Sequence, residues 1–422
     1  IYISIFKKKK YKLLQMVKIC IFGLGYVGLP LLFKASSKFN VIGYDIDKKR
    51  ISDLRNKIDK NNEFKKKDFN NKKLFFTNNI NNTKDSNFYI ICTPTPIDKN
   101  NKPNLNPIKK SFSEIAKFLK KGDIIILEST VYPGVTELFT KKLEKKTGLI
   151  NNKDFFVCYS PERINPGDKK NSLSNINKII AFDTKNKKIS KIVKIVYQNF
   201  CKKLIITSNI KEAETAKVIE NIQRDLNISL FNELLIISNK LDLNFSEVIR
   251  LANTKWNFMK FQAGLVGGHC LPVDPYYLSY VSQKHKFKPN VILAGRKINE
   301  SMKYFVISQI MKKIQNIKNT NKKNNDLKIL IVGLTYKYGV ADMRNSQNYQ
   351  IFQEIKKNYR NTFAYDPFSK ESNYDIKKNY NDLSDFKLIV FLSKGPLFKE
   401  VYRKINLLKN DSILDPFYYY NN

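Results

Sequence analysis

The sequence predicts an α/β protein with two doubly wound parallel sheets, joined by a long central helix and a further helical region. Short apolar runs alternate with helical patterns in the first part of the chain, which is typical of βαβ units. A helical pattern then continues without interruption over residues 210–241, and a second alternation begins near residue 326. The 422 residues are enough for two or three domains.

Four apolar runs predict strands of the first sheet, at residues 18–22, 41–45, 88–92 and 124–128. A helix is expected after Gly25, and a first domain over residues 16–208. Met16 resembles a natural start directly before a strand, so residues 1–15 are expected to be a disordered extension. A basic run followed by apolar residues imitates a signal peptide there, but three glycines and Pro30 interrupt the apolar stretch.

The middle and last parts of the chain follow from spacing and composition. Apolar residues recur every three or four positions in residues 210–241, as in an amphipathic helix, and we expect a central helical domain over residues 209–314. Residues 316–325 are rich in Lys and Asn and predict a linker. Apolar runs at residues 327–332 and 388–392 predict strands, so a last α/β domain is expected over residues 326–422.

The chain is strongly basic, with 76 Lys and Arg against 37 Asp and Glu and a formal net charge of +39. Such an excess can indicate binding to nucleic acid or to an anionic membrane. Here the Lys residues are dispersed through Asn-rich segments such as residues 57–73 and 318–325, rather than gathered in a stripe with aromatic residues between them. We expect a solvated surface, with no specific nucleic-acid partner and no insertion into a membrane.

The five cysteines form no CxxC pair and no close cluster with both histidines. Neither a disulfide framework nor a metal site is therefore predicted. This usage favours a reducing compartment, the cytoplasm.

The first chemical motif is a GxGxxG run between a predicted strand and a predicted helix, made of Gly23, Leu24, Gly25, Tyr26, Val27 and Gly28. Backbone N–H groups and the helix dipole at such a turn can hold a pyrophosphate. Asp45 ends the next predicted strand, 17 residues after Gly28, where a carboxylate can accept hydrogen bonds from a ribose. This order favours NAD as the cofactor over a purely structural turn.

The second motif is a loop in which Cys270 follows two glycines and precedes Asp274 by four residues. Pro272 and Pro275 disfavour a helix, and the glycines allow a ligand to approach the backbone. A thiol becomes a nucleophile where a nearby cation or donor stabilises its thiolate, and Cys270 is the predicted nucleophile. The other four cysteines are expected to be small buried residues. His269 is not expected to be its base, because adjacent residues normally point apart.

The third motif lies on the predicted central helix, where Lys217 and Asn221 are four residues apart and share a face. A cation and an amide can together hold an oxyanion. Glu214 and Arg224 continue near this face, so a surface charge ladder is the alternative interpretation. The presence of Cys270 favours the catalytic one.

Together with the runs at residues 91–95 (ICTPT), 128–134 (ESTVYPG) and 160–163 (SPER), these motifs resemble the UDP-glucose/GDP-mannose dehydrogenase family. The resemblance covers nearly the whole chain from Met16. It implies a Rossmann domain that binds NAD, a central helical region that forms a homodimer, and a Rossmann-like C-terminal domain that binds UDP. Residues 216–224, 255–258 and 265–270 look most like the bacterial UDP-N-acetylhexosamine 6-dehydrogenases of capsule and O-antigen synthesis, with glucosamine and galactosamine both open.

The resemblance also implies a mechanism. In this family a cysteine attacks the C6 aldehyde formed by a first hydride transfer, a second hydride leaves the thiohemiacetal, and water releases the thioester as a uronate. Cys270 is then the nucleophile, and Lys217 and Asn221 would stabilise oxyanions. Thr130 and Asp274 would position water, and Glu162 would act as an acid or base. The cofactor site gains Arg50, Thr93, Pro94, Thr130 and Arg344. The substrate site would hold Glu162, Arg163, Lys217, Asn221, Gly267 and Lys337.

The chain departs from the family pattern at residues 338–342, between Lys337 and Arg344, and at Lys394, where a His is common. Three alternatives stand beside the hexosamine interpretation. The substrate can be UDP-glucose or GDP-mannose. A β-hydroxyacid dehydrogenase of similar layout would transfer one hydride and would not need Cys270. A basic nucleic-acid or membrane-surface protein could keep a vestigial dinucleotide fold.

Overall fold

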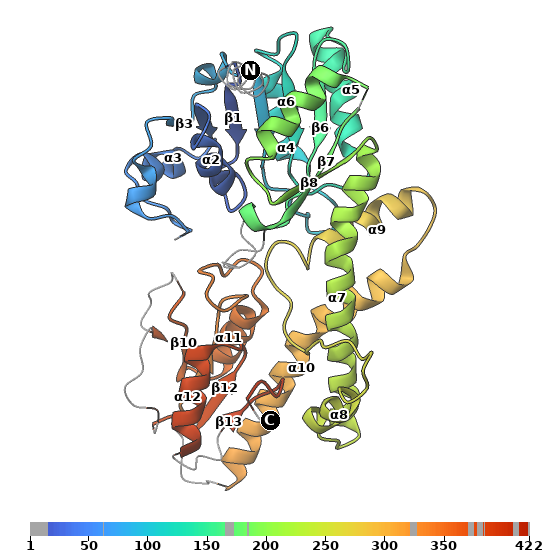
Figure 1. Ribbon diagram of the computed structural model, residues 1–422. Coiled ribbons are helices and arrows are strands. Elements are labelled where there is room, and N and C mark those ends of the chain that lie inside the picture. The colour runs from blue at the N-terminus through green and yellow to red at the C-terminus, as the bar shows by residue number, and fades with distance from the viewer. Residues whose placement is uncertain are drawn as a thin grey trace. The chain divides into compact units, whose positions relative to one another are not determined.

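The computed structural model describes residues 16–61, 63–164, 173–183, 185–320, 327–369, 375–377, 383, 385–407 and 413–420. Contacts divide the chain into two units, Ile1–Glu220 with Tyr276–His285, and Asn221–Pro275 with Lys286–Asn422 (Figure 1). Residues 1–15, where we expected a disordered extension, lie outside the described residues.

The first unit is built on an eight-stranded sheet whose strands are all parallel except where β6 meets β7. In spatial order the strands are β3(Leu74–Thr77), β2(Val41–Tyr44), β1(Ile19–Phe22), β4(Phe88–Ile91), β5(Ile124–Leu127), β6(Phe156–Tyr159), β7(Asn177–Ala181) and β8(Lys203–Thr207). The order reverses between β1 and β4, as in a doubly wound sheet. The four strands expected from the apolar runs are β1, β2, β4 and β5.

Both faces of this sheet are buried, because neighbouring residues of a strand point to opposite faces. On β1, Ile19 and Ile21 belong to one apolar core, and Cys20 and Phe22 belong to the other. The first core is closed by α2(Gly28–Ser36), α3(Lys48–Arg55) and α6(Lys187–Tyr197). The second is closed by α4(Asn106–Ile115) and α5(Val135–Thr147). Because helices cover both faces of the sheet, side chains on both faces of the central strands β1, β4, β5 and β6 are buried, and the sequences of these strands are apolar without interruption.

The second unit contains a parallel five-stranded sheet that winds in the same way. Its strands in spatial order are β11(Ile376–Lys377), β10(Thr362–Tyr365), β9(Ile329–Val332), β12(Leu388–Phe391) and β13(Ile413–Leu414). The helices of this part of the chain are α8(Phe245–Ala252), α10(Asn290–Thr320), α11(Gln347–Asn358) and α12(Pro396–Leu407). The prediction of two doubly wound sheets is therefore confirmed.

A long helix, α7(Ile210–Lys240), connects the two units along the chain, as the apolar spacing predicts. The predicted linker at residues 316–325 is wrong in its first half, because α10 continues to Thr320. Ile310 and Ile314 are buried in the core beside the second sheet and Ile317 packs against it, so the apolar face carries the helix into Lys- and Asn-rich sequence. Residues 321–326 lie outside the described residues.

Candidate active site

The glycine turn after β1 is closed at two of its glycines and open at the third. Gly23 has φ +88°, and a Cβ on Gly28 would lie 1.9 Å from the carbonyl oxygen of Gly23. Neither position accepts a side chain without movement of the backbone. A Cβ on Gly25 would meet nothing within 4 Å. The turn therefore leaves room for a ligand at Gly25.

Two side chains form hydrogen bonds with the backbone of this turn at Leu24. Asp45 Oδ2 accepts the N–H of Leu24 at 2.8 Å, and Arg50 Nε donates to the carbonyl of Leu24 at 3.0 Å. Arg50 also pairs with the buried Asp59 at 3.0 Å. The NH2 group of Arg50 is buried and has no hydrogen-bond partner among the described residues. Arg50 thus supports the turn and retains one buried donor.

The start of α2 suits an anion. Its N-cap, Val27, makes no side-chain cap, and no acidic residue lies in the first turn. The N–H of Leu29 already donates to the carbonyl of Gly25 at 3.2 Å, so a phosphate would meet the N–H groups before it, where the helix dipole favours a negative charge. These residues fit a dinucleotide with its pyrophosphate at the turn and a ribose at Asp45, as the sequence predicts.

The other predicted cofactor residues of the first unit lie after β4 and β5. The hydroxyl of Thr93 is buried without a hydrogen-bond partner among the described residues, while Pro94 is exposed and Thr130 is half-buried. Ser129 donates to the carbonyl of Thr93 at 2.7 Å, which ties these two loops together. The carboxyl ends of β1, β4 and β5 therefore contribute to one region, at the point where the strand order reverses.

The turn after β9 repeats the geometry of the turn after β1. Gly333 has φ +90°, and its N–H donates to Tyr365 at 2.9 Å, as Gly23 donates to Tyr44 at 2.9 Å. Asp366 takes the place of Asp45 and accepts the N–H of residue 334 at 2.8 Å. Asp366 is fully buried and also accepts from the backbone N–H and hydroxyl of residue 335 and the backbone N–H of residue 368. This second carboxylate is therefore committed to the protein itself.

Glu162 and Arg163 follow β6 and are tied to neighbouring groups. Glu162 is 7% exposed, and its Oε1 accepts the N–H of Arg163 at 2.6 Å. The guanidinium of Arg163 pairs with Glu220 on α7. Glu162 Oε2 lies 3.4 Å from the buried ammonium of Lys178, a residue that the sequence reasoning missed. A Lys in the apolar run of β7 is the only sequence signal for it.

Lys217 and Asn221 are both buried, at 6% exposure each, whereas Arg224 is exposed. Glu214 is fully buried and accepts the N–H groups of Gly134 and Thr136. The alternative interpretation of this face of α7 as a ladder of solvated surface charges is therefore wrong. The amide of Asn221 donates to Asp274 Oδ2 at 2.5 Å, so the structure brings together two of the predicted catalytic residues in the second unit.

The Cys270 loop presents its thiol to solvent. Cys270 is exposed, and its carbonyl accepts the N–H groups of Val273 at 3.0 Å and Asp274 at 2.8 Å, just before α9(Asp274–Lys284). None of the five cysteines is in a disulfide. Burial raises the pKa of the thiols of Cys20, Cys92, Cys158 and Cys201, which makes them poor nucleophiles. The prediction that the other four are small buried residues agrees with the burial of Cys20 and Cys158, whereas Cys92 and Cys201 are half-buried.

The glycines before Cys270 fix the loop against the segment after β9. A Cβ on Gly267 would lie 2.8 Å from the carbonyl of Asn345, and one on Gly268 would lie 2.7 Å from the ring of Tyr336. The Asn345 amide donates to the carbonyl of Gly268 at 3.1 Å. Lys337, the predicted substrate residue, follows Tyr336 directly and is half-buried.

His269 contacts a carboxylate that the sequence reasoning did not identify as its partner. Its Nε2 lies 2.9 Å from Oδ2 of Asp342. Asp342 also holds Arg344 in two contacts, 3.0 Å to Nε and 2.8 Å to NH2. The unusual segment at residues 338–342 therefore ends in a carboxylate that orients both His269 and the predicted cofactor residue Arg344.

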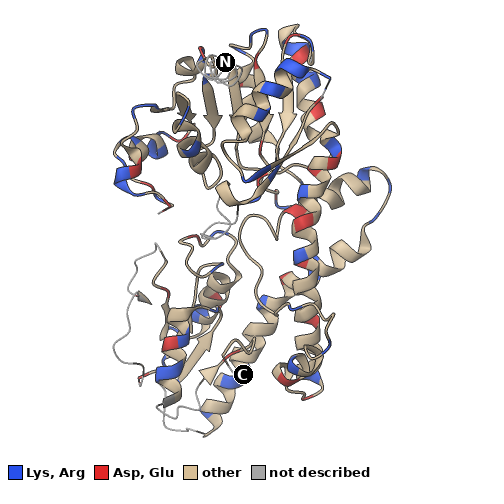
Figure 2. Ribbon diagram, viewed as in Figure 1, with Lys and Arg blue, Asp and Glu red and all other residues tan. Residues whose placement is uncertain are grey.

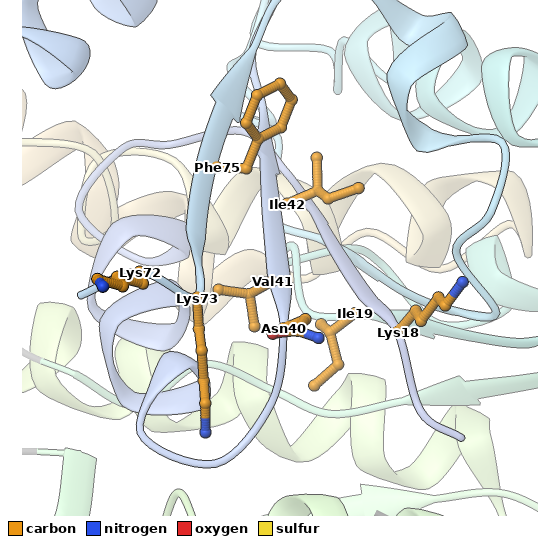
Figure 3. A pocket seen from close by; sticks show the side chains of 8 residues that line it. All are labelled: Lys18, Ile19, Asn40, Val41, Ile42, Lys72, Lys73 and Phe75. Atoms are coloured by element: carbon orange, nitrogen blue, oxygen red, sulfur yellow. The ribbon is translucent and has the colours of Figure 1, made fainter. Parts of the chain in front are cut away.

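One pocket, of about 270 Å³, lies elsewhere (Figure 3). It is lined by Lys18, Ile19, Asn40, Val41, Ile42, Lys72, Lys73 and Phe75. These residues lie at the amino ends of β1 and β2 and beside β3, whereas the glycine turn follows the carboxyl end of β1. The pocket is therefore unrelated to the predicted chemistry.

Lys and Arg are scattered over helices and loops of each unit rather than gathered in one stripe (Figure 2). Within the described part of the chain, no group of three His, Cys, Asp or Glu residues is arranged to hold a metal. No helix among the described residues is long and apolar enough to cross a membrane.

Comparison with known proteins accounts for both units. Three domain models of the UDP-glucose/GDP-mannose dehydrogenase family match in order, the NAD binding domain at residues 17–201, the central domain at 211–301 and the UDP binding domain at 330–422.

Relatives cover most of the chain. Protein CapL of Staphylococcus aureus is 44% identical over 345 residues, 80% of this chain and 79% of that protein. UDP-N-acetyl-D-glucosamine 6-dehydrogenase of Salmonella typhi is 44% identical over 355 residues, which are 83% of this chain and 82% of that protein. The solved UDP-D-ManNAc dehydrogenase of Pyrococcus horikoshii has a TM-score of 0.80 at 31% identity and covers 94% of this chain and 93% of that one. The chain therefore belongs to the UDP-glucose/GDP-mannose dehydrogenase family and is an NAD-dependent nucleotide-sugar dehydrogenase.

Proposed function

We propose that the protein oxidises the C6 alcohol of UDP-N-acetylglucosamine to the uronate, with four electrons removed in two steps, for the synthesis of a surface polysaccharide. The observation that carries this proposal is the exposed thiol of Cys270 in a glycine-fixed loop, four residues before the Asn221–Asp274 pair. The relatives at 44% identity support glucosamine as the sugar, since one of them is named for that substrate.

The proposed chemistry assigns the cofactor to the glycine turn. The turn would hold NAD, which would supply the hydride acceptor for both oxidations at C6. Its pyrophosphate would meet the start of α2, a ribose would meet Asp45, and Arg50, Thr93, Pro94 and Thr130 would complete the part of the site in the first unit. Arg344 of the second unit stays a predicted cofactor residue.

The covalent step belongs to Cys270. Its thiolate attacks the C6 aldehyde and forms a thiohemiacetal, which the second oxidation converts to a thioester. Lys217 and Asn221 stabilise the negative charge that develops on the C6 oxygen, because an ammonium and an amide N–H both donate to an oxyanion. The contact from Asn221 to Asp274 orients the amide before substrate arrives.

Hydrolysis of the thioester needs a positioned water and a proton acceptor. We assign the water to Thr130 and Asp274, and the acceptor to Glu162. Lys337, Gly267 and Arg163 would hold the nucleotide sugar. The domain limits that we propose, residues 16–208, 209–314 and 326–422, place these roles on all three parts of the chain.

A homodimer is proposed from an exposed apolar face on α7 and α8. Leu230 and Ile237 share one face of α7, since they are seven residues apart, and are 50% and 46% exposed. Leu241, directly after the helix, is 62% exposed. On α8, Leu251 is 54% exposed, and Trp256 in the following loop is 92% exposed. So large an apolar face fits a second copy of the chain. The cytoplasm is the proposed location, because an exposed catalytic thiol needs reducing conditions.

The experiment is to measure NADH formed per UDP-N-acetylglucosamine or UDP-N-acetylgalactosamine consumed, for the wild type, for Cys270→Ser and for Cys201→Ser as the half-buried control. We expect two NADH per sugar, the same ratio in Cys201→Ser, and no uronate from Cys270→Ser. One NADH per sugar, or full turnover of Cys270→Ser, would replace the thioester route with a simple dehydrogenase. UDP-glucose and GDP-mannose are assayed in the same way, and oxidation of one of these alone would make it the proposed substrate instead. If none of the four nucleotide sugars gives NADH, the alternative of a basic nucleic-acid or membrane-surface protein is favoured.

A further inference from the structure

A fully buried lysine at the carboxyl end of the first sheet has no part in the roles assigned above. Lys178 Nζ lies 2.6 Å from Oε2 of Glu128 and 3.4 Å from Oε2 of Glu162, and it donates to the carbonyl of Pro161 at 3.3 Å. The side chains of Lys178 and Glu128 are both 0% exposed. A buried ammonium costs several kcal/mol unless it is paired, so these two carboxylates are its compensation.

The backbone places Lys178 opposite Glu162. Strands β6 and β7 pair antiparallel, with Tyr159 opposite Ala181. Three residues after Tyr159 is Glu162, and three residues before Ala181 is Lys178, so these two side chains are at equal distances from the last strand pair, and their 3.4 Å contact agrees with this spacing. Glu128 directly follows β5, the parallel neighbour of β6. The ammonium is thus positioned by strand pairing rather than by a flexible loop.

Each oxygen of the Glu162 carboxylate has a fixed donor. Oε1 accepts the backbone N–H groups of Arg163 at 2.6 Å and Ile164 at 2.5 Å, and Oε2 faces Lys178. These donors fix the direction of both carboxylate oxygens. Glu128 is held on its other oxygen by the hydroxyl of Tyr197 at 2.6 Å.

The titratable and charged groups around Glu162 come from several elements. They are Glu128 after β5, Lys178 on β7, Tyr197 on α6, the thiols of Cys92 and Cys201, and Arg163, whose charge is shared with Glu220. Burial opposes the charge on Lys178, but the two carboxylates outweigh it and raise its pKa. Burial raises the pKa of Glu128, and the ammonium of Lys178 opposes this rise. Lys178 is therefore a permanent cation shared by two carboxylates.

We propose that Lys178 is a positioning residue, which faces Glu162 with an ammonium and holds its carboxylate in one orientation as the base for thioester hydrolysis, while Glu128 limits how much of the ammonium's charge acts on Glu162. The proposal rests on the proposed role of Glu162. In this step the water oxygen bonds to the thioester carbon, the C–S bond breaks with its electron pair on Sγ of Cys270, and Glu162 takes one water proton. The other proton stays on the carboxylic acid product.

The test is the pH dependence of hydrolysis, measured in a single turnover as the decay of the Cys270 adduct by intact mass. Lys178→Met removes the cation that faces Glu162, so the acid limb of the hydrolysis rate should move to higher pH. Lys178→Arg should restore the wild-type limb. Glu128→Gln removes a competing anion and keeps an acceptor for Tyr197, so its limb should move down.

The opposite shifts separate positioning from folding. A merely structural role would scale the rate at every pH and leave the limb in place, and that result in Lys178→Met or in Glu128→Gln overturns the proposal. If Lys178→Met does not fold, the direction of the shift in Glu128→Gln decides between the two roles. Glu162→Gln distinguishes a failure of the proposed role of Glu162 from a failure of the proposed role of Lys178. Normal hydrolysis in this variant contradicts the role of Glu162 itself. Blocked hydrolysis in Glu162→Gln with unshifted limbs in the other variants contradicts only the role of Lys178.

Discussion

The Nε2 atom of His269 lies 2.9 Å from Oδ2 of Asp342, which ties the residue before Cys270 to the segment after β9. An ionised carboxylate only accepts hydrogen bonds, so Nε2 carries the hydrogen and Asp342 sets the orientation of the ring. The same carboxylate binds Arg344 through two nitrogens. Asp342 is only 4% exposed, so both partners depend on one buried charge.

Asp342→Asn should therefore lower the free energy of unfolding by about 1–3 kcal/mol at pH 7, because hydrogen bonds to a charged group are lost. The matched control is Asp385→Asn, whose exposed pair with Lys328 at 3.2 Å should contribute at most about 1 kcal/mol. Denaturant unfolding of both variants measures the difference. Equal effects would show that the His269 and Arg344 contacts do not stabilise the fold.

The effect of Asp342 should also depend on pH. Burial opposes its ionisation, but hydrogen bonds from His269 and Arg344 outweigh burial and hold the pKa of this carboxyl well below its usual range. A depressed folded-state pKa gives stability that is fully present above the unfolded value of about 3.9 and is lost as the pH falls below it. The gap between the wild type and Asp342→Asn should accordingly narrow below about pH 4. A gap at pH 2 as large as the gap at pH 7 would mean that charge is not its origin.

Gly25 and Gly28 form a second matched pair. A Cβ on Gly28 would overlap the carbonyl oxygen of Gly23, so Gly28→Ala should cost roughly 2 kcal/mol or more of stability. Gly25 faces open space, so Gly25→Ala should keep its stability within about 0.5 kcal/mol and weaken NAD binding by about tenfold or more. Thermal unfolding and NAD titration distinguish the two outcomes. Unchanged NAD affinity in Gly25→Ala would place the cofactor elsewhere.

Asp123 is a buried carboxyl whose charge opposes folding. Burial raises its pKa to about 6, and the N–H of Lys120 only partly offsets this rise. Because the folded-state pKa lies above the unfolded value, stability falls as the pH rises through about 6. Asp123→Asn should thus stabilise the protein by roughly 1–3 kcal/mol at pH 8 and have little effect at pH 4.

The control for Asp123 is Asp154→Asn. Asp154 accepts the N–H of Ile150 and has a lowered pKa, so this variant should give no gain at pH 8. Denaturant unfolding at both pH values measures each change. A gain in Asp154→Asn as large as that in Asp123→Asn would mean that total charge, rather than burial of one carboxyl, sets the result.

Leu251→Glu tests the proposed homodimer. A charge in the exposed apolar face of α7 and α8 should convert a dimer to a monomer at micromolar concentration, because burying an unpaired carboxylate is costly. Ile58→Glu is the control, since Ile58 is also exposed, at 49%, but lies far along the chain after α3. Sedimentation equilibrium gives the masses. Two dimeric variants would exclude this face as the interface, and a monomeric wild type would exclude the homodimer itself.

The sequence predicted those features that depend on neighbouring residues. The strands around the glycine turn, the central helix and the exposed Cys270 loop all follow from local periodicity, glycines and prolines. The extension of α10 to Thr320 was missed because composition outweighed the continuing spacing of Ile310, Ile314 and Ile317.

Contacts between distant segments could not be predicted in this way. Lys178 meets Glu128 across 50 residues, through pairing of three strands, and a single Lys in a strand is otherwise a common surface residue. Asp342 meets His269 across 73 residues. Only the register of the sheet and the path of the loops select these partners, and neither is encoded in a short motif.

The commitment of Asp366 to its own backbone has a kinetic consequence. Of the two similar turns in the described residues, only the one at Gly23 is followed by a carboxylate that solvent can reach, because Asp45 is half-buried and Asp366 is 0% exposed. The proposed reaction nevertheless withdraws two hydrides from each sugar. The spent cofactor must then leave and a fresh one must enter halfway through each catalytic cycle. During that exchange the half-oxidised sugar must remain on the protein, so its dwell time has to exceed the time that the cofactor needs to be replaced.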